Sequence, residues 1–407
     1  MNLNPIGIAV PLFFLFISIE WLICIWKDKK YYRLNDVVGD LGCGSGDQIL
    51  GIFWKVVTVG IYAWVYTNFA LIELPQNNIW VWIGAFVAID FFYYLFHRFS
   101  HVIHIGWATH QVHHQSEDFN LAVALRQSWF AKVFAWVFYI PVALAGVGPV
   151  IYATCYAFNL LYQFWIHTRL IGKMGPFEWI MNTPSHHRVH HGTNPKYLDK
   201  NFAGVFIIWD RLLGTFVEED EEPVYGVLAP LRSWNPWTVN CFPVVQLFRK
   251  SLSMQGIDKL LIWFAPTNWK TKPQNKASVF PVAGSGYDQD NGKAHPYILL
   301  HLISLGFFMT WLLLFTKQIP MNVKLPTSFL LILTVCCWAG MLEARPWVRW
   351  TENLRLLAMG AMGFYALTLS SWPLAISLIS FSIISLIWFA SIPILPSFPA
   401  QAKSDSS

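Results

Sequence analysis

Residues 79–101 read IWVWIGAFVAIDFFYYLFHRFSH, and this stretch decides how the chain folds. The part from 79 to 96 is almost wholly apolar, and a helix of about 20 such residues crosses the hydrocarbon core of a bilayer. His97 and His101 follow directly, four residues apart, so both lie on one face of the helix where it leaves the membrane. The stretch therefore predicts a transmembrane helix that ends in a pair of histidines.

The composition of the whole chain also indicates a membrane protein. Of the 407 residues, 55% are hydrophobic and 13% are charged, against roughly 25% charged residues in soluble domains. This balance excludes a disordered chain, and the glycines follow no collagen-like period. Six scattered cysteines are too few for a secreted disulfide scaffold. The net charge of +5 without a long basic run argues against a nucleic-acid partner.

Further apolar stretches predict an all-α integral membrane protein, a bundle of several spanning helices. The stretch 129–166 is too long for one crossing. Prolines and glycines from 141 to 149 interrupt it, so it predicts a helical hairpin that crosses and returns. The first span has no basic segment before it and no cleavage site after it, so we expect a retained anchor. The single spans are predicted at 5–26, 50–72, 79–96, 297–316, 326–342, 353–370 and 373–395.

Lysine and arginine near the span ends predict the orientation, because basic loops stay in the cytoplasm. The loop after the first span is basic and is therefore predicted to be cytoplasmic. Counting crossings from there places His97 on the cytoplasmic face, and the returning hairpin brings His167 to the same face. The residues used are Lys27, Lys29, Lys30 and Arg33, with Arg345, Arg349 and Arg355 on the same side and Lys317 and Lys324 on the opposite one.

Eleven of the 13 histidines lie between His97 and His191, and their spacing repeats in three boxes. Residues three and four apart on a helix share a face, so two imidazoles can bind one ion at about 2.0 to 2.1 Å. The boxes supply eight ligands and His167 a ninth, more than one ion can use, so the sequence predicts two metal ions. His104 and His186 are the candidate substitutes. The boxes are His97-Arg-Phe-Ser-His101, His110-Gln-Val-His113-His114 and His187-Arg-Val-His190-His191.

Iron fits this ligand set better than the alternatives. Structural zinc sites use four ligands and usually include cysteine, and no cysteine lies near the boxes. The chain has no His-Glu-x-x-His motif, and a facial triad would use only two of the histidines. A cluster of solvated histidines without a metal would repel itself when protonated. Open positions on ferrous iron predict dioxygen chemistry.

Other features have plainer interpretations. Gly42-Cys-Gly-Ser-Gly46 resembles a phosphate-binding loop, but no strand precedes it and no lysine follows, so we expect a flexible turn between helices. Glu117 and Asp118 either orient imidazole N–H groups or cap the next helix. His295 and His301 flank a late span, and His301 is expected to be a packed or interfacial side chain.

At the boxes the sequence resembles the fatty acid hydroxylase and sterol desaturase superfamily, integral membrane enzymes whose histidine boxes hold a dinuclear iron centre. Longer runs are most similar to the alkylglycerol monooxygenases, the subfamily that cleaves ether lipids. A weaker likeness extends through Arg345-Pro346 into the last spans. The runs are Trp107 to His114 continuing through Glu117, Asp118 and Asn120 to Leu125-Arg-Gln-Ser128; Tyr162 to Thr168; Asn182 to Gly192; and Asp199 to Phe216.

The resemblance implies iron ligands, a lipid substrate, O2 and an electron donor, either tetrahydrobiopterin or a redox protein. Animal members carry a glutamate, linked to the pterin, directly after the second histidine of the first box. This chain has Val102 there, and an uncharged side chain cannot pair with a pterin N–H, so the donor stays open. The implied iron ligands are His97, His101, His110, His113, His114, His187, His190 and His191, with His167 added.

Together these features predict a membrane-bound di-iron monooxygenase. It would insert one oxygen beside the ether oxygen of an alkylglycerol, and the product would collapse to a fatty aldehyde and a glycerol derivative. A hydroxylase or desaturase of sterols, fatty acyl chains or carotenoids would carry the same boxes. An alternative from another class is a metal transporter or sensor, but a transporter would place polar ligands near the middle of several spans.

The predicted active site faces the cytoplasm, at the endoplasmic reticulum in a eukaryote or at the inner membrane in a bacterium. The segment after the boxes is richer in proline, asparagine and charge, and forms either a lid or a flexible connector. The predicted organisation is N-terminal spans at 1–78, a catalytic core at 79–216, a cytoplasmic connector at 217–296, C-terminal spans at 297–396 and a polar tail at 397–407.

Overall fold

The computed structural model describes residues 5–269, 292–368 and 372–392. These residues form helices joined by loops and three isolated β-bridges, and no strand occurs among them, so the predicted all-α class is confirmed. The helices are α1 (Pro5–Trp26), α2 (Leu34–Phe69), α3 (Ile79–Val102), α4 (His104–His114), η1 (Val123–Leu125), α5 (Lys132–Phe138), α6 (Ile140–Leu144), α7 (Pro149–Trp165), η2 (Gly175–Trp179), α8 (Pro184–His190), α9 (Ile208–Leu213), α10 (Pro236–Leu252), α11 (Asp258–Phe264), η4 (Gly292–Ala294), α12 (His295–Leu314), α13 (Met321–Leu342), α14 (Val348–Thr368) and α15 (Trp372–Ser391).

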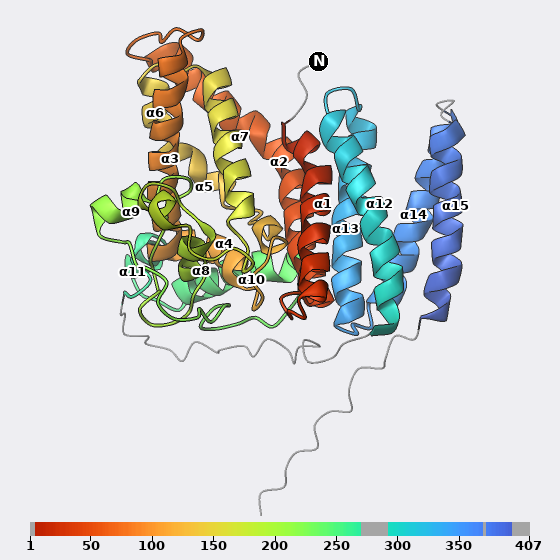
Figure 1. Ribbon diagram of the computed structural model, residues 1–407. Helices are drawn as coiled ribbons and strands as arrows, with labels where there is room; N and C mark the ends of the chain where they lie inside the picture. The colour runs from red at the N-terminus through yellow and green to blue at the C-terminus, as the bar shows by residue number, and fades with distance from the viewer. Residues whose placement is uncertain (1–4, 270–291, 369–371, 393–407) are drawn as a thin grey trace, which may run out of the picture.

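The long helices form the membrane part of the molecule. Five of them, α1, α2, α3, α12 and α13, are long and apolar enough to cross a membrane. They stand beside α7, α14 and α15 in one upright row, whereas the short helices α4, α8, α10 and α11 gather near its lower end (Figure 1). Large apolar side chains such as Leu22, Ile303 and Ile383 are exposed on the outer faces of the long helices. A bilayer would cover these side chains.

The stretch 129–166 forms a helical hairpin, as predicted, but its helices, of 7, 5 and 17 residues, are shorter than the five that are long enough to cross a membrane. The chain passes through α5 and α6, turns at residues 145–148 and returns through α7. Leu71 N–H donates to the Leu144 carbonyl at 2.8 Å, so the turn lies against the loop between α2 and α3. Gly146 has φ +89°, and a Cβ there would lie 2.0 Å from the Ile72 carbonyl oxygen, so glycine is required at this close approach.

Helix α2 corrects two expectations. It begins at Leu34, well before residue 50, and the glycine run 42–46 lies inside it where a flexible turn was expected. A Cβ on Gly46 would lie 2.3 Å from the ring of Trp129, and one on Gly44 would lie 2.3 Å from the Leu125 carbonyl oxygen. The absent side chains therefore let the segment that follows the second box pack directly onto the α2 backbone, which explains glycine within a helix.

The histidine end of α3 lies at the same end of the bundle as the first basic loop. Arg33 N–H donates to Asp118 at 3.0 Å, and Asn120 Nδ2 donates to the Tyr31 carbonyl at 2.7 Å. Asp118 and Asn120 both belong to the loop that follows the second box. The crossing count, which placed the boxes and residues 27–33 on one side, agrees with this arrangement.

The described part of the predicted connector is an irregular segment at 217–235 followed by the helices α10 and α11. Helix α10 packs against α4, and Leu247 and Ile262 meet Ile105 and Ala108 in a small apolar cluster. Helices α10 and α11 therefore brace the helix of the second box. The remainder of the predicted connector, 270–291, lies outside the described residues.

Candidate metal centre

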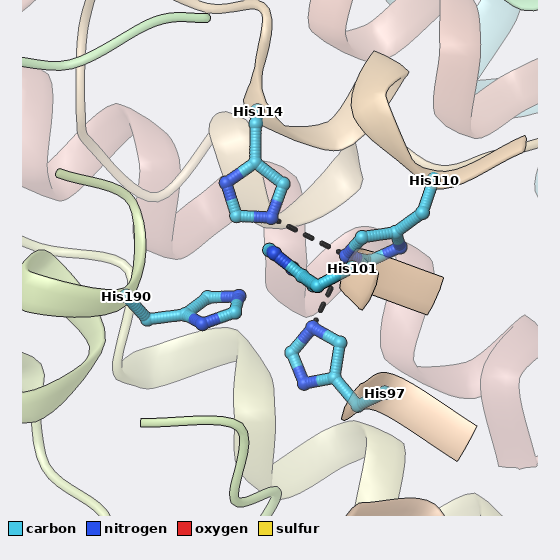
Figure 2. Close-up of side chains that lie close together, drawn as sticks. All are labelled: His97, His101, His110, His114 and His190. Carbon is cyan, nitrogen blue, oxygen red and sulfur yellow. Dashed lines mark hydrogen bonds between the residues drawn. The ribbon is translucent and has the colours of Figure 1, made fainter. Parts of the chain in front are cut away.

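The structure brings all nine predicted histidines together in two neighbouring groups. They come from the end of α3, from α4, from the residue pair after α7 and from α8 with the residue that follows it. Within each group the candidate ligand atoms lie within 4.8 Å of one another. Group one is His97, His101, His110, His114 and His190 (Figure 2), and group two is His113, His167, His187 and His191.

The spacing within the boxes decides the group. Histidines four apart enter the same group: His97 with His101, His110 with His114, and His187 with His191. The remaining histidine of the second box, His113, lies three residues after His110 and enters group two, and that of the third box, His190, lies three residues after His187 and enters group one. This outcome corrects the expectation that residues three and four apart converge alike. Positions i and i+4 differ by about 40° around a helix and positions i and i+3 by about 60° in the opposite sense, so the two neighbouring groups can divide them.

The nine imidazoles are buried or nearly so. Eight are at most 6% exposed, and His110 is intermediate. The Nε2 atoms of His101, His190 and His191 are buried with no hydrogen-bond partner among the described residues. Leaving a buried polar atom without a partner costs about 1 to 3 kcal/mol. A bound cation would satisfy these atoms.

Hydrogen bonds at the far ring atoms fix which nitrogen faces inward. The Nδ1 of His113 lies 3.0 Å from the Arg126 carbonyl, and that of His167 lies 2.7 Å from the Gln163 carbonyl. A carbonyl only accepts, so both Nδ1 atoms carry the proton and both Nε2 atoms carry a lone pair. These Nε2 atoms lie 3.3 Å apart. Two nitrogens bound to one ion at about 2.1 Å, 90 to 110° apart, are separated by roughly 3.0 to 3.4 Å.

A short loop segment orients two members of group one by hydrogen bonds and places a carboxylate near a third. His97 Nδ1 lies 2.8 Å from the Phe202 carbonyl, His190 Nδ1 lies 2.9 Å from the Lys200 carbonyl, and His101 Nδ1 lies 3.6 Å from Asp199. Asp199 and Asn201 have φ values of +55° and +54°. The left-handed backbone at these two positions is costly for non-glycine residues. The two residues keep this conformation in a segment whose Lys200 and Phe202 carbonyls point at the imidazoles of His190 and His97.

Two buried carboxylates hold this segment, and the sequence analysis did not single them out. Asp210 accepts from the N–H groups of Phe202 at 2.8 Å and Ala203 at 2.9 Å. Asp90 accepts from the N–H groups of Val205 at 2.8 Å and Phe206 at 3.0 Å. A signal for Asp90 was present, because a carboxylate inside an apolar span marks a functional position by default. Asp210 lies in the Asp199–Phe216 run, which was noted only for its family likeness.

The imidazoles are neutral at physiological pH. Burial lowers the pKa of His113 to about 4, although its hydrogen bond to Arg126 acts in the opposite direction. Burial, reinforced by neighbouring imidazoles, holds the pKa values of His114, His190 and His191 well below the usual range. Neutral imidazole is the form that binds a metal ion.

The other candidate residues lie outside the two groups. His104 Nδ1 pairs with the Ala265 carbonyl at 3.0 Å, and the ring of His186 meets Phe216 edge to face. Glu117 and Asp118 form ion pairs with Arg33, and within the described part of the chain neither hydrogen-bonds to an imidazole. His301, expected to be packed or interfacial, is buried on α12.

Comparison with known proteins identifies the family. The fatty acid hydroxylase family matches residues 82–215, which contain all nine histidines. Alkylglycerol monooxygenase of Xenopus tropicalis is 38% identical over 363 residues, which cover 86% of this chain and 80% of that protein. The chain belongs to the alkylglycerol monooxygenase family.

Two further relatives agree. The Danio rerio alkylglycerol monooxygenase is 39% identical over 306 residues, with 74% of this chain and 68% of that protein covered. The Homo sapiens protein is 36% identical over 360 residues, with 86% and 80% covered. No solved structure matches the chain significantly.

Membership in the alkylglycerol monooxygenase family confirms the predicted class of enzyme. The chain is a membrane lipid monooxygenase, an oxidoreductase that depends on O2. The family is iron-dependent, and the two histidine groups are suited to binding metal. The donor set fits iron, because it is all nitrogen, neutral and preoriented by backbone carbonyls.

Proposed function

We propose that this enzyme holds two iron ions, one in each histidine group, and cleaves the ether bond of alkylglycerols. The observation that carries the proposal is the pair of buried, all-nitrogen groups with five and four members. The names of the relatives supply the substrate. Iron held by the two histidine groups would supply O2 activation. Two electrons from the donor and two protons would reduce one oxygen atom to water, and the other would enter the C–H bond beside the ether oxygen. The resulting hemiacetal then breaks into a fatty aldehyde and a glycerol derivative.

The protein's own residues prepare this site in two ways. Backbone carbonyls of Arg126, Gln163, Lys200 and Phe202 hold the imidazole Nδ1–H groups, so the Nε2 atoms face inward before any ion arrives. Burial of the histidines keeps bulk water away from the reacting centre. These features support oxidation of a substrate that reaches the site from an apolar region.

A cavity between α1, α2 and α12 supports a lipid substrate. Val10, Phe14 and Leu305 line its apolar wall, and it extends to Leu125 and Gln127. These last two residues flank Arg126, the residue whose carbonyl orients His113. An alkyl chain in this cavity would lie among the helices while its glycerol end approached the histidines.

The proposed active site faces the cytoplasm, because it lies at the end of the bundle that carries the basic loop at residues 27–33. The membrane would be the endoplasmic reticulum in a eukaryotic cell or the inner membrane in a bacterium. The electron donor is a tetrahydropterin or a redox protein. Val102 ends α3, and its carbonyl accepts from Thr267 N–H at 2.9 Å. This position carries an apolar side chain where the resemblance to the animal members places a pterin-linked glutamate.

An aerobic assay of the purified protein on a 1-O-alkylglycerol, with and without tetrahydrobiopterin, tests the function. We expect fatty aldehyde to form only with O2, at about two iron ions per chain. His113→Ala should abolish activity, whereas His104→Ala, a matched change outside both groups, should retain at least half of it. Aldehyde formed anaerobically would contradict the mechanism. Unchanged alkylglycerols beside altered sterols in cells lacking the gene would favour the sterol hydroxylase alternative.

A further inference from the structure

The four C-terminal helices α12 to α15 enclose an elongated cavity that the proposed reaction does not use. It contains about 840 Å³ of space between atoms, including the part open to the surroundings, and most of its lining is apolar. His301, Thr334 and Arg355 line one end, and Trp311 and Tyr365 line the other. Ten residues of α12 separate His301 from Trp311, which corresponds to about 15 Å along the helix. These helices lie on the opposite side of the molecule from α8 and α9 (Figure 1).

The polar end of the cavity contains a buried ion pair whose charges cancel. Arg355 donates through Nε and Nη2 to the two carboxylate oxygens of Glu352 at 2.7 and 2.6 Å. Its Nη1 donates to Thr334 at 3.2 Å. Glu352 is 0% exposed and Arg355 is 3% exposed. Charged residues within membrane helices are costly, and where they occur they mark functional positions.

His301 adds a hydrogen-bond donor without an acceptor. Its Nδ1 lies 3.4 Å from Arg355 Nη2, and a guanidinium group only donates, so Nδ1 carries the lone pair. The proton of the neutral ring is therefore on Nε2. That atom is buried with no hydrogen-bond partner among the described residues. A ligand that fills the cavity would remove this deficit if its polar end carried an oxygen acceptor.

We propose that the cavity binds a neutral, single-chain lipid. Its hydroxyl, ether or carbonyl oxygen accepts from His301 Nε2–H, and its chain lies along α12 and α13 toward Trp311. The occupant is neutral because Glu352 compensates the charge of Arg355. Leu305 lines both this cavity and the one that reaches Leu125, so the lipid site adjoins the cavity proposed for the substrate chain.

Photolabelling of the full chain tests the site independently of catalysis. The probe is a monoacylglycerol with a diazirine in its chain, presented in phosphatidylcholine nanodiscs, and the labelled residues are mapped by peptide mass spectrometry. We expect labels on α12 and α13. Unlabelled 1-monooleoylglycerol should compete, whereas anionic oleate should compete at least fivefold less well. Equal competition by oleate, or labels spread over all exposed helix faces, would overturn the proposal.

Four variants complete the test. Leu331→Trp, at a buried lining residue, fills the cavity and should abolish labelling, whereas Ile303→Trp on the exposed face of α12 should not change it. His301→Phe should weaken labelling about fivefold through loss of one hydrogen bond, and His301→Gln, which keeps a donor, should stay within twofold. Each variant must elute and unfold as the parent does. Full labelling of a folded Leu331→Trp protein would refute the site.

Discussion

Replacement of Asp210 by asparagine should lower the metal affinity of group one, although Asp210 itself is not a predicted ligand. Asp210 accepts three hydrogen bonds, from Phe202 N–H, from Ala203 N–H and from Thr215 Oγ1 at 2.6 Å. Asparagine keeps one acceptor oxygen and turns an NH2 group toward a buried N–H. Loss of one bond to a charged acceptor, with a donor left unpaired, costs about 2 to 4 kcal/mol.

The effect reaches the metal because the Phe202 carbonyl holds His97. Loss of a group that orients a ligand lowers metal affinity roughly 10- to 100-fold. We therefore expect Asp210→Asn to give up iron to a chelator at 10- to 100-fold lower chelator concentration than the parent protein. Iron retained per chain is measured by atomic emission after buffer exchange, with thermal unfolding recorded in parallel.

The matched control is Asp220→Asn. Asp220 is an exposed carboxylate close in sequence that pairs with Lys196, so its loss should leave iron retention unchanged. If Asp210→Asn keeps iron as tightly as the parent while Asp220→Asn behaves the same, the segment 199–202 does not position the ligands. If both variants lose iron equally, the effect is not specific to the Phe202 contact.

Three further outcomes follow from the packing, the burial and the grouping. Gly46→Ala should lower the free energy of unfolding by about 1 to 3 kcal/mol, because its Cβ would meet Trp129, whereas Gly60→Ala, with open space around it on the same helix, should be neutral or stabilising in chemical denaturation. The free energy of unfolding of the iron-free protein should fall by about 3 kcal/mol through His113 alone as the pH falls from 6.5 to 4. In this pH range the His113 side chain takes up a proton in the unfolded chain but not in the folded one. A Tm that rises on acidification would contradict this expectation. His101→Ala and His191→Ala should each weaken a different iron, so metal titration should show two distinct affinities in both variants, and a single unchanged affinity would contradict the grouping.

The clustering of the nine histidines could be predicted from the sequence because its signal is local. Spacing of four residues on a helix brings two imidazoles to one face whatever the rest of the fold does, and His97 with His101 shows this. The membrane helices were predictable for a similar reason, since apolar length alone identifies α3 or α12. The division of the second and third boxes between two groups was not predictable, because it depends on where α4, α7 and α8 meet.

The supporting residues escaped prediction because their role depends on tertiary contacts. The carbonyls of Lys200 and Phe202 belong to the backbone, so no pattern of side chains in the sequence predicts their hydrogen bonds to the imidazoles. The glycines at 42–46 were interpreted from local preference as a turn, although a helix tolerates them when a neighbour such as Trp129 fills the space. Asp90 was visible in the sequence, but its four partners come from segments more than 60 residues away.

The paired histidines at the end of each later box explain how one small set of helices can build two metal positions. Neighbouring residues on a helix point about 100° apart, so His113 and His114 face different groups, as do His190 and His191. The rings of His114 and His191 stack at 4.3 Å across the boundary. Both groups thus share the backbone of α4 and α8, and rigid helical turns would set the separation of the two proposed metal ions. Boxes with four-residue pairs alone would lack both His113 and His190, leaving four imidazoles in group one and three in group two, so the doublets supply one further imidazole to each group.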